Sequence, residues 1–147
     1  MQTVKIRQLT REDLNKPEFY ELLSELSVAP KPDEFYLDNF FESLYDRRKT
    51  ILVLEEDGVI VSTGSLFLEH KLIRNLGRVA HIEDIVTKHE YRNKGYGTLL
   101  INELVKIAKE CDCYKVILDA AHHNTKFYED CGFRQHEVCM RLDLNGN

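Results

Sequence analysis

A short glycine-containing segment, Arg92-Asn93-Lys94-Gly95-Tyr96-Gly97, is the part of the chain best suited to bind an anion. It lies between a strand-like run and a helix-like run, and a helix N-terminus presents unpaired backbone N–H groups and a partial positive charge. Glycines remove side chains that would hold an anion away from those groups. Arg92 and Lys94 add local positive charge. The segment therefore predicts a pyrophosphate cradle, and the alternative is a tight turn that binds nothing.

The elements before this loop form a predicted antiparallel meander. Residues 4–7 alternate as a short strand, and helical segments are expected near Thr10 and over residues 19–26. Asp33 is a candidate N-cap for a further helix, whose apolar positions continue to Tyr45. Strands are expected over residues 51–54 and from residue 59 to about 72, joined by an Asp57-Gly58 turn, and then over residues 79–86. A loop with Asn75 and Gly77 separates the last two strands.

The elements after the loop alternate between helix and strand. A long helix begins at the glycines and continues to about Cys111, and residues 114–119 follow as a strand. Asn124 or Thr125 caps a short helix that ends at Gly132, and residues 138–142 form a closing strand. The expected order is β-α-α-β-β-β-α-β-α-β. This order predicts a single α/β domain over residues 1–147, with a mixed, mostly antiparallel central sheet flanked by helices.

Composition excludes several classes of protein. The 147 residues are 43% hydrophobic and 31% charged, with a net charge of −5, so a general nucleic-acid binder is not expected. No apolar run approaches the roughly 20 residues of a membrane span, and the N-terminus has no apolar signal-peptide core. The four cysteines are expected to be free thiols in a reducing cytosol. Neither their spacing nor the His122-His123 pair fits a metal site.

The glycine loop after an antiparallel meander resembles the Q/R-x-x-G-x-G/A signature of the GNAT superfamily of N-acetyltransferases. Three further segments are similar to the family of eukaryotic glucosamine 6-phosphate N-acetyltransferases: residues 81–85 (HIEDI), 113–119 (CYKVILD) and 124–133 (NTKFYEDCGF). The resemblance implies the GNAT fold and a homodimer whose subunits share the sugar sites. It also implies acetyl transfer from acetyl-CoA to the 2-amino group of glucosamine 6-phosphate, for UDP-N-acetylglucosamine synthesis in the cytoplasm.

The resemblance also implies how acetyl-CoA is held. The backbone of Ile85 and Val86 supplies an N–H to the thioester oxygen, on a strand that splays from its neighbour. Tyr128 is the candidate acid for the CoA thiolate, because a phenol with a pKa of roughly 10 can donate a proton; simple core packing is the alternative. The expected cofactor-binding residues are Ile85, Val86, Arg92, Asn93, Lys94, Gly95, Tyr96, Gly97, Thr98, Asn124, Lys126 and Tyr128.

Carboxylates and cations are assigned to the sugar phosphate in the same way. Glu83 is the choice for sugar binding and a possible water-mediated base, and Asp119 for orienting the amine. Glu83 and Asp84 are adjacent on a strand, so their side chains are expected on opposite faces. The family's C-terminal Arg position holds Asp143 here, and Arg141 lies one strand period earlier. The expected substrate-binding residues are Ser27, Lys71, Leu72, Ile73, Arg74, Glu83, Asp84, Tyr114, Lys115, Asp119 and Arg141.

Two other functions remain open from the sequence. One is an acetyltransferase of the same fold that acts on a protein N-terminus, a lysine or a polyamine. The other is an acyl-CoA-binding module without catalysis. The cations Lys71, Arg74, Lys115 and Arg141 favour a phosphorylated acceptor over the first. Tyr128, Glu83 and Asp119, together with the glycine loop, favour catalysis over the second.

Overall fold

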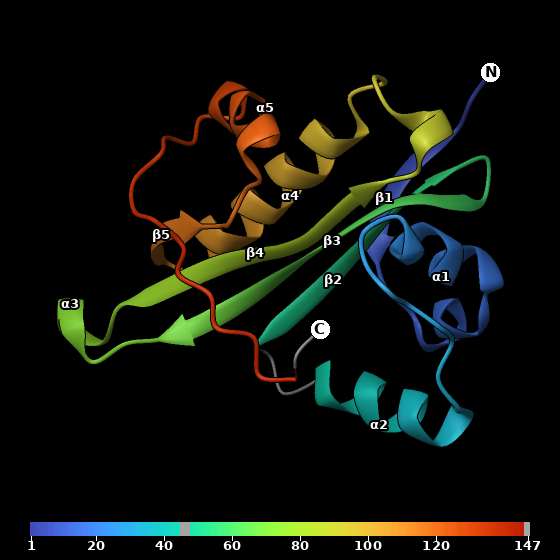
Figure 1. Ribbon diagram of the computed structural model, residues 1–147, viewed down its shortest axis with the longest axis horizontal. Coiled ribbons are helices and arrows are strands. Elements are labelled where there is room, and N and C mark those ends of the chain that lie inside the picture. Colours follow the sequence, from blue (N-terminus) through green and yellow to red (C-terminus); the bar gives the residue numbers. More distant parts are fainter. Residues whose placement is uncertain (45–47, 146–147) are drawn as a thin grey trace.

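Five strands form one twisted sheet in the computed structural model, which describes residues 1–44 and 48–145 (Figure 1). The strands are β1 (Val4–Gln8), β2 (Lys49–Glu56), β3 (Val59–His70), β4 (Arg78–Thr87) and β5 (Cys113–Ile117). They lie in the order β1-β2-β3-β4-β5. The first four are antiparallel and β5 runs parallel to β4. The predicted mixed, mostly antiparallel sheet is therefore confirmed, although β5 ends two residues before the expected Asp119.

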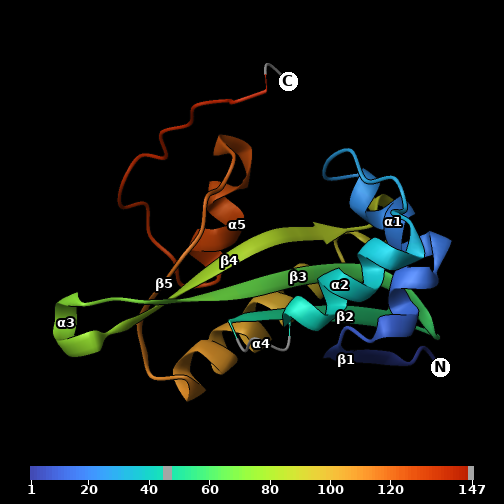
Figure 2. The same cartoon turned by 90° about the horizontal axis from the view of Figure 1, so that it is seen from below.

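Helices cover both faces of this sheet. The main ones are α1 (Pro17–Ser24), α2 (Glu34–Leu44), α4 (Tyr96–Glu110) and α5 (Thr125–Asp130). Short turns complete the set: η1 (Arg11–Asn15), α3 (Ile73–Leu76), η2 (His89–Tyr91) and η3 (His122–Asn124). Figure 2 shows α4 beneath the sheet and α1 on the opposite side.

Alternating apolar residues divide the core into two clusters, as a two-faced sheet requires. On one face, Leu52, Leu54 and Ile82 pack with Leu100 and Leu104 of α4. The other face carries a second cluster that joins the sheet to α1 and α2, with members Leu9, Leu14, Phe19, Tyr20, Leu22, Leu37, Val53, Ile60 and Val86. The helices therefore bury the middle of the sheet from both sides.

Turn chemistry explains the hairpins. Asp57 and Gly58 both have positive φ, at 51° and 84°, which is the conformation that a tight two-residue hairpin requires. The expected loop between β3 and β4 is instead the short turn α3, in which Arg74, Asn75 and Leu76 all have positive φ. Gly132, with a φ of 97°, follows the C-cap residue Cys131 of α5, and this ends the helix as predicted.

The α2 helix is less buried than its apolar spacing predicts. Only Leu37 is fully buried, whereas Phe35 and Tyr36 are 69% and 63% exposed. The wide apolar face expected from the sequence therefore packs on the sheet along a narrow stripe. Tyr45, the last predicted position of this helix, lies outside the described residues.

The predicted closing strand over residues 138–142 is wrong for the single chain. This segment has no strand pairing in the described structure, and Val138, Met140 and Leu142 are 84–88% exposed. The tail leaves the β5 side and runs above the sheet face opposite α4 (Figures 1 and 2). Alternation indicates a strand, but a strand forms only where another strand edge pairs with it.

Candidate active site

The sheet opens between β4 and β5. The two strands pair only from Arg78–Cys113 to His81–Ile117, and the register shifts once between Arg78 and Val79. Beyond His81, β4 continues to Thr87 with no partner from β5. The strand therefore separates from β5 in the segment that contains Ile85 and Val86, as the sequence resemblance implied, and its edge on that side has no strand partner among the described residues.

A bulge in β4 reshapes this edge. Thr63 pairs with Val86 and Ser65 with Glu83, so only Gly64 lies opposite Asp84 and Ile85. Asp84 has a φ of 53°. A Cβ atom at Gly64 would collide with the Ile85 side chain. Gly64 therefore makes room for the bulged strand.

The bulge also breaks the alternation expected for Glu83 and Asp84. Ile82 and Ile85 both pack on the α4 side of the sheet, so two residues separate them instead of one. Asp84 lines a pocket of about 390 Å³ between the sheet, α1 and α2, together with Ser65, the cross-strand partner of Glu83. Asp84 thus reaches the side of the sheet that also carries Ser65, and the opposite-face expectation is corrected here.

The predicted anion cradle lies at the start of α4, next to the free edge of β4. No side chain caps this helix, so its first backbone N–H groups remain open to a ligand. Gly95 has a φ of 84°, and a Cβ atom built there would meet nothing within 4 Å. Bare, accessible N–H groups at a helix N-terminus are suited to phosphate binding.

Both cations of the loop are already paired with carboxylates. Arg92 donates to Glu25 Oε1 at 3.3 Å and to the Thr87 carbonyl at 2.9 Å. Lys94 Nζ donates to Glu56 Oε1 at 2.9 Å. Neither Glu25 nor Glu56 was identified from the sequence. They lie 67 and 38 positions from their partners, so no local pattern indicates these contacts.

Tyr128 lies on α5, which packs against the start of α4. Its ring makes edge-on contacts with Phe127 and Phe133, at centroid distances of 5.0 and 6.1 Å. Within the described part of the chain, no hydrogen bond involves its hydroxyl. Burial, followed by the nearby Cys131, raises the pKa of Tyr128. The phenol is therefore protonated at neutral pH and available as a donor.

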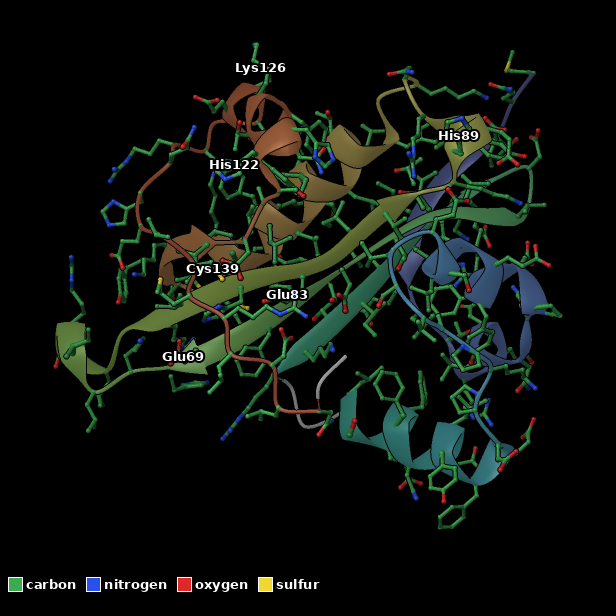
Figure 3. All side chains as sticks on the ribbon, in the orientation of Figure 1. Glu69, Glu83, His89, His122, Lys126 and Cys139 are labelled. Atoms are coloured by element: carbon green, nitrogen blue, oxygen red, sulfur yellow. The ribbon has the colours of Figure 1, made fainter. Side chains whose placement is uncertain are left out.

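The other two α5 candidates lie at the surface. Asn124 is the exposed N-cap residue of α5. Lys126 is 82% exposed and its Nζ lies 2.6 Å from Asp130 Oδ1, one turn along the same helix. Figure 3 shows Lys126 pointing outward from the first turn of α5. An exposed i,i+4 pair of this kind leaves the ammonium free to exchange partners.

The predicted carboxylates Glu83 and Asp119 share one neighbour, Cys139 in the C-terminal tail. Figure 3 labels Glu83 and Cys139. The Asp119 charge, with smaller contributions from burial and Glu83, raises the pKa of the Cys139 thiol. The structure therefore brings Glu83 and Asp119 to one region, although Glu83 lies on β4 and Asp119 lies in the segment that follows β5. Cys139 was not a predicted site residue.

The predicted phosphate ligands gather at the far end of the sheet. The Arg74 guanidinium lies 4.9 Å from the centroid of the Tyr114 ring, and Lys115 Nζ lies 5.7 Å from it. Lys71 pairs with Glu69, which also contacts His81 Nε2 at 2.9 Å. By register, Lys115 lies beside Val79, two residues before His81 and four before Glu83 on β4. Lys115 thus shares the face of His81 and Glu83, opposite α4.

The remaining predicted residues are more distant or exposed. Leu72 and Ile73 are exposed in the β3–β4 turn, and Ser27 is exposed just after α1. Arg141 lies on the tail and pairs with Asp143 at 2.7 Å. In the single chain, the residues expected to bind acetyl-CoA therefore lie near the start of α4. The residues expected to bind the sugar phosphate are spread over the sheet face opposite α4 and the β3–β4 turn.

Comparison with known proteins identifies the class that this fold and site define. The family model described as Acetyltransferase (GNAT) family matches residues 16–133. The chain belongs to this family, whose members use acetyl-CoA as the acetyl donor.

Two relatives within this family that are similar to the chain over nearly its full length have the same enzyme name. The chain is 38% identical over 143 residues to a glucosamine 6-phosphate N-acetyltransferase of Arabidopsis thaliana, covering 95% of both chains. It is 38% identical over 138 residues to an enzyme of the same name from Candida albicans, covering 94% of this chain and 93% of that protein. The crystal structure of the Arabidopsis enzyme matches with a TM-score of 0.92 at 37% identity, over 97% of this chain and 99% of the other.

Proposed function

We propose that this protein transfers an acetyl group from acetyl-CoA to the 2-amino group of D-glucosamine 6-phosphate. The products are N-acetyl-D-glucosamine 6-phosphate and CoA, in UDP-N-acetylglucosamine biosynthesis. The observation that carries the proposal is the near full-length similarity to relatives of that name, in sequence and in structure. The chain acts as one domain over residues 1–147.

The residues present fit acetyl-CoA. The open N-terminus of α4 and the unfilled space at Gly95 suit the pyrophosphate. The unpaired edge of β4 suits the pantetheine arm, which carries amide groups that pair with free backbone N–H and C=O groups. Bound there, acetyl-CoA supplies an activated thioester carbonyl to the site.

The chain's own residues then serve the two ends of the reaction. A backbone N–H at Ile85 or Val86 polarises the thioester oxygen. The Tyr128 hydroxyl donates a proton at the CoA sulfur, and its raised pKa keeps that proton in place at neutral pH. On the acceptor side, Glu83 receives a proton from the amine through water, and Asp119 orients the amine. These roles balance one proton taken from the amine with one given to sulfur.

The cations favour a phosphorylated acceptor. The Arg74 guanidinium and Lys115 Nζ lie 4.9 and 5.7 Å from the centroid of the Tyr114 ring, and Lys71 directly follows β3. Such a cluster favours the 6-phosphate through charge-assisted hydrogen bonds. Arg141 adds a cation from the tail.

A homodimer completes the acceptor site in this proposal. In the described structure β5 is an edge strand with β4 as its single partner. The tail presents Val138, Met140, Leu142 and Leu144, each more than 80% exposed. Alternating apolar residues and an open strand edge complement each other between two copies of the chain. The tail is therefore expected to become a strand on association.

A cytoplasmic location is part of the proposal. All four cysteines are unpaired, including the near neighbours Cys111 and Cys113. Free thiols are typical of a reducing compartment. Over the described residues, no helix is both long and apolar enough to cross a bilayer.

An acceptor panel tests the activity. Purified protein is mixed with acetyl-CoA and glucosamine 6-phosphate, glucosamine, galactosamine 6-phosphate, spermidine or a lysine peptide, and CoA release is measured. Fast turnover with glucosamine 6-phosphate alone is the expected result. Turnover with spermidine or the lysine peptide would favour a different acetyltransferase. CoA binding without turnover would indicate a binding module.

A further inference from the structure

Lys94, in the glycine loop, forms an ion pair with Glu56 of the sheet, a carboxylate that is almost fully buried. Glu56 is the last residue of β2, and its side chain is only 8% exposed. Two groups of the glycine loop converge on its Oε1 atom: the ammonium of Lys94 at 2.9 Å and the hydroxyl of Tyr96. Lys94 also lies 5.1 Å from the centroid of the Tyr91 ring. A buried carboxylate is costly without such partners.

Tyr96 joins this carboxylate to the core. It is the first residue of α4 and only 6% exposed, and its ring packs with Leu100 in the apolar cluster between the sheet and α4. Its hydroxyl is then the one polar tip that must find a partner. Glu56 supplies that partner from the end of β2, and thereby connects the start of α4 to the central sheet.

We propose that Glu56 is a positioning residue for acetyl-CoA binding, which holds Lys94 and Tyr96 so that the backbone N–H groups of the glycine loop face the pyrophosphate. This inference rests on the proposed function for its ligand. It assigns the Lys94 side chain a different role from the local positive charge for the pyrophosphate that was expected from the sequence. The ammonium acts through Glu56, and the backbone makes the contact.

The position of Gly95 supports this role of Glu56, because Gly95, with its φ of 84°, lies between Lys94 and Tyr96, the two residues that Glu56 holds. A glycine is the freest hinge in the chain. Tethers at Lys94 and Tyr96 therefore fix the one flexible point at which the helix begins, and a preordered loop binds its ligand without the cost of ordering.

Calorimetry with CoA tests the inference on the intact protein. Glu56→Gln keeps the size of the side chain but removes its charge, and we expect the Kd for CoA to rise about 5- to 20-fold, within the usual range of coupling between residues and sites. Tyr96→Phe is expected to act in the same direction. In steady-state kinetics, KM for acetyl-CoA rises while KM for glucosamine 6-phosphate is unchanged.

Glu55→Gln is the matched control. Glu55 is adjacent and also ion-paired, but its partner is Arg7, away from the glycine loop. This control is expected to lower the melting temperature and leave the Kd for CoA unchanged. If Glu56→Gln alters only the melting temperature in the same way, the inference is overturned.

A double-mutant cycle separates the two roles of Lys94. If Lys94 acts through Glu56, Lys94→Met and Glu56→Gln together weaken CoA binding by less than the sum of their separate effects. Additive losses would instead mean a direct pyrophosphate contact and would overturn the inference. Because the calorimetric measurements use CoA alone, a failure to acetylate glucosamine 6-phosphate contradicts the proposed function without affecting the measured Kd values. Absence of CoA binding by the wild-type protein overturns both.

Discussion

Gly97 of α4 lies directly against Phe127 of α5, so closely that a Cβ atom at Gly97 would be 3.1 Å from the Phe127 Cζ atom. The second glycine of the signature therefore lets two helices approach as well as leaving backbone N–H groups bare. Because Phe127 precedes Tyr128, this contact also places the candidate proton donor relative to the cofactor loop.

Gly97→Val is expected to reduce both stability and CoA affinity. The extra methyl groups must displace the Phe127 ring, and overpacking of this kind costs about 1–3 kcal/mol. Thermal unfolding and CoA calorimetry measure the two losses. Combining Gly97→Ala with Phe127→Leu should relieve the contact and restore stability relative to Gly97→Ala alone. Unchanged CoA affinity in a folded Gly97→Val variant would mean that the glycine loop does not bind the pyrophosphate of CoA.

Tyr128→Phe is expected to lower kcat by about 10²- to 10⁴-fold, the contribution of a general acid. The rings of Phe127 and Phe133 still pack on the remaining phenyl ring, so the melting temperature and both KM values should change little. Steady-state kinetics with a melting curve decides the matter. A near-normal kcat would mean that Tyr128 is not a catalytic residue. At constant kcat, a raised KM would indicate that Tyr128 binds a substrate, and a lowered melting temperature would indicate that it packs in the core.

Lys115→Ala is expected to raise KM for glucosamine 6-phosphate far more than KM for acetyl-CoA. Loss of one charge-assisted contact costs about 1.5–3 kcal/mol. Lys106→Ala, an exposed position on α4, is the control and should change neither value. If Lys115→Ala weakens the use of unphosphorylated glucosamine equally, Lys115 does not bind the phosphate.

Met140→Glu is expected to convert a homodimer to monomers. Met140 is 88% exposed in the single chain, so the substitution should leave the monomer's fold intact. A charge in the middle of the alternating tail would be buried against the partner at high cost. Sedimentation equilibrium of both proteins gives the answer. A wild-type protein that is monomeric at micromolar concentration would contradict the proposed shared site.

Acid should unfold the protein partly through Asp13, whose side chain is fully buried. Burial alone favours the neutral carboxyl, but hydrogen bonds from Arg7, Thr10 and Lys16 outweigh it and hold the pKa of Asp13 well below its usual range. A lowered folded-state pKa stabilises the fold above the unfolded value of about 3.9, and this contribution is lost as the pH falls toward the folded value.

The matching variant is Asp13→Asn, which leaves Arg7 and Lys16 without their shared anion. We expect a loss of about 3–5 kcal/mol in urea unfolding at pH 7. The difference from wild type should shrink as the pH is lowered below 4. Glu12→Gln, an exposed neighbour, should change little. A difference that stays constant with pH would mean that the Asp13 charge does not contribute.

Local signals in the sequence were sufficient for much of this protein. The Asp57-Gly58 hairpin, the helix that begins at the glycine loop and the end of α5 at Gly132 all depend on backbone preferences of a few consecutive residues. The same holds for the uncapped N-terminus of α4, since a strand, two glycines and a helix in succession produce its open N–H groups. The motifs around Glu83 and Tyr128 likewise sufficed for the family.

Tertiary structure decided what depends on distant partners. The pairing of Arg92 with Glu25 and of Lys94 with Glu56 joins residues far apart in the chain, so spacing alone could not show the partners of the two loop cations. The β4 bulge turned Asp84 because Gly64 on the next strand left room for Ile85. The closing strand failed to form because alternation is local, whereas a strand requires a second edge with which to exchange hydrogen bonds.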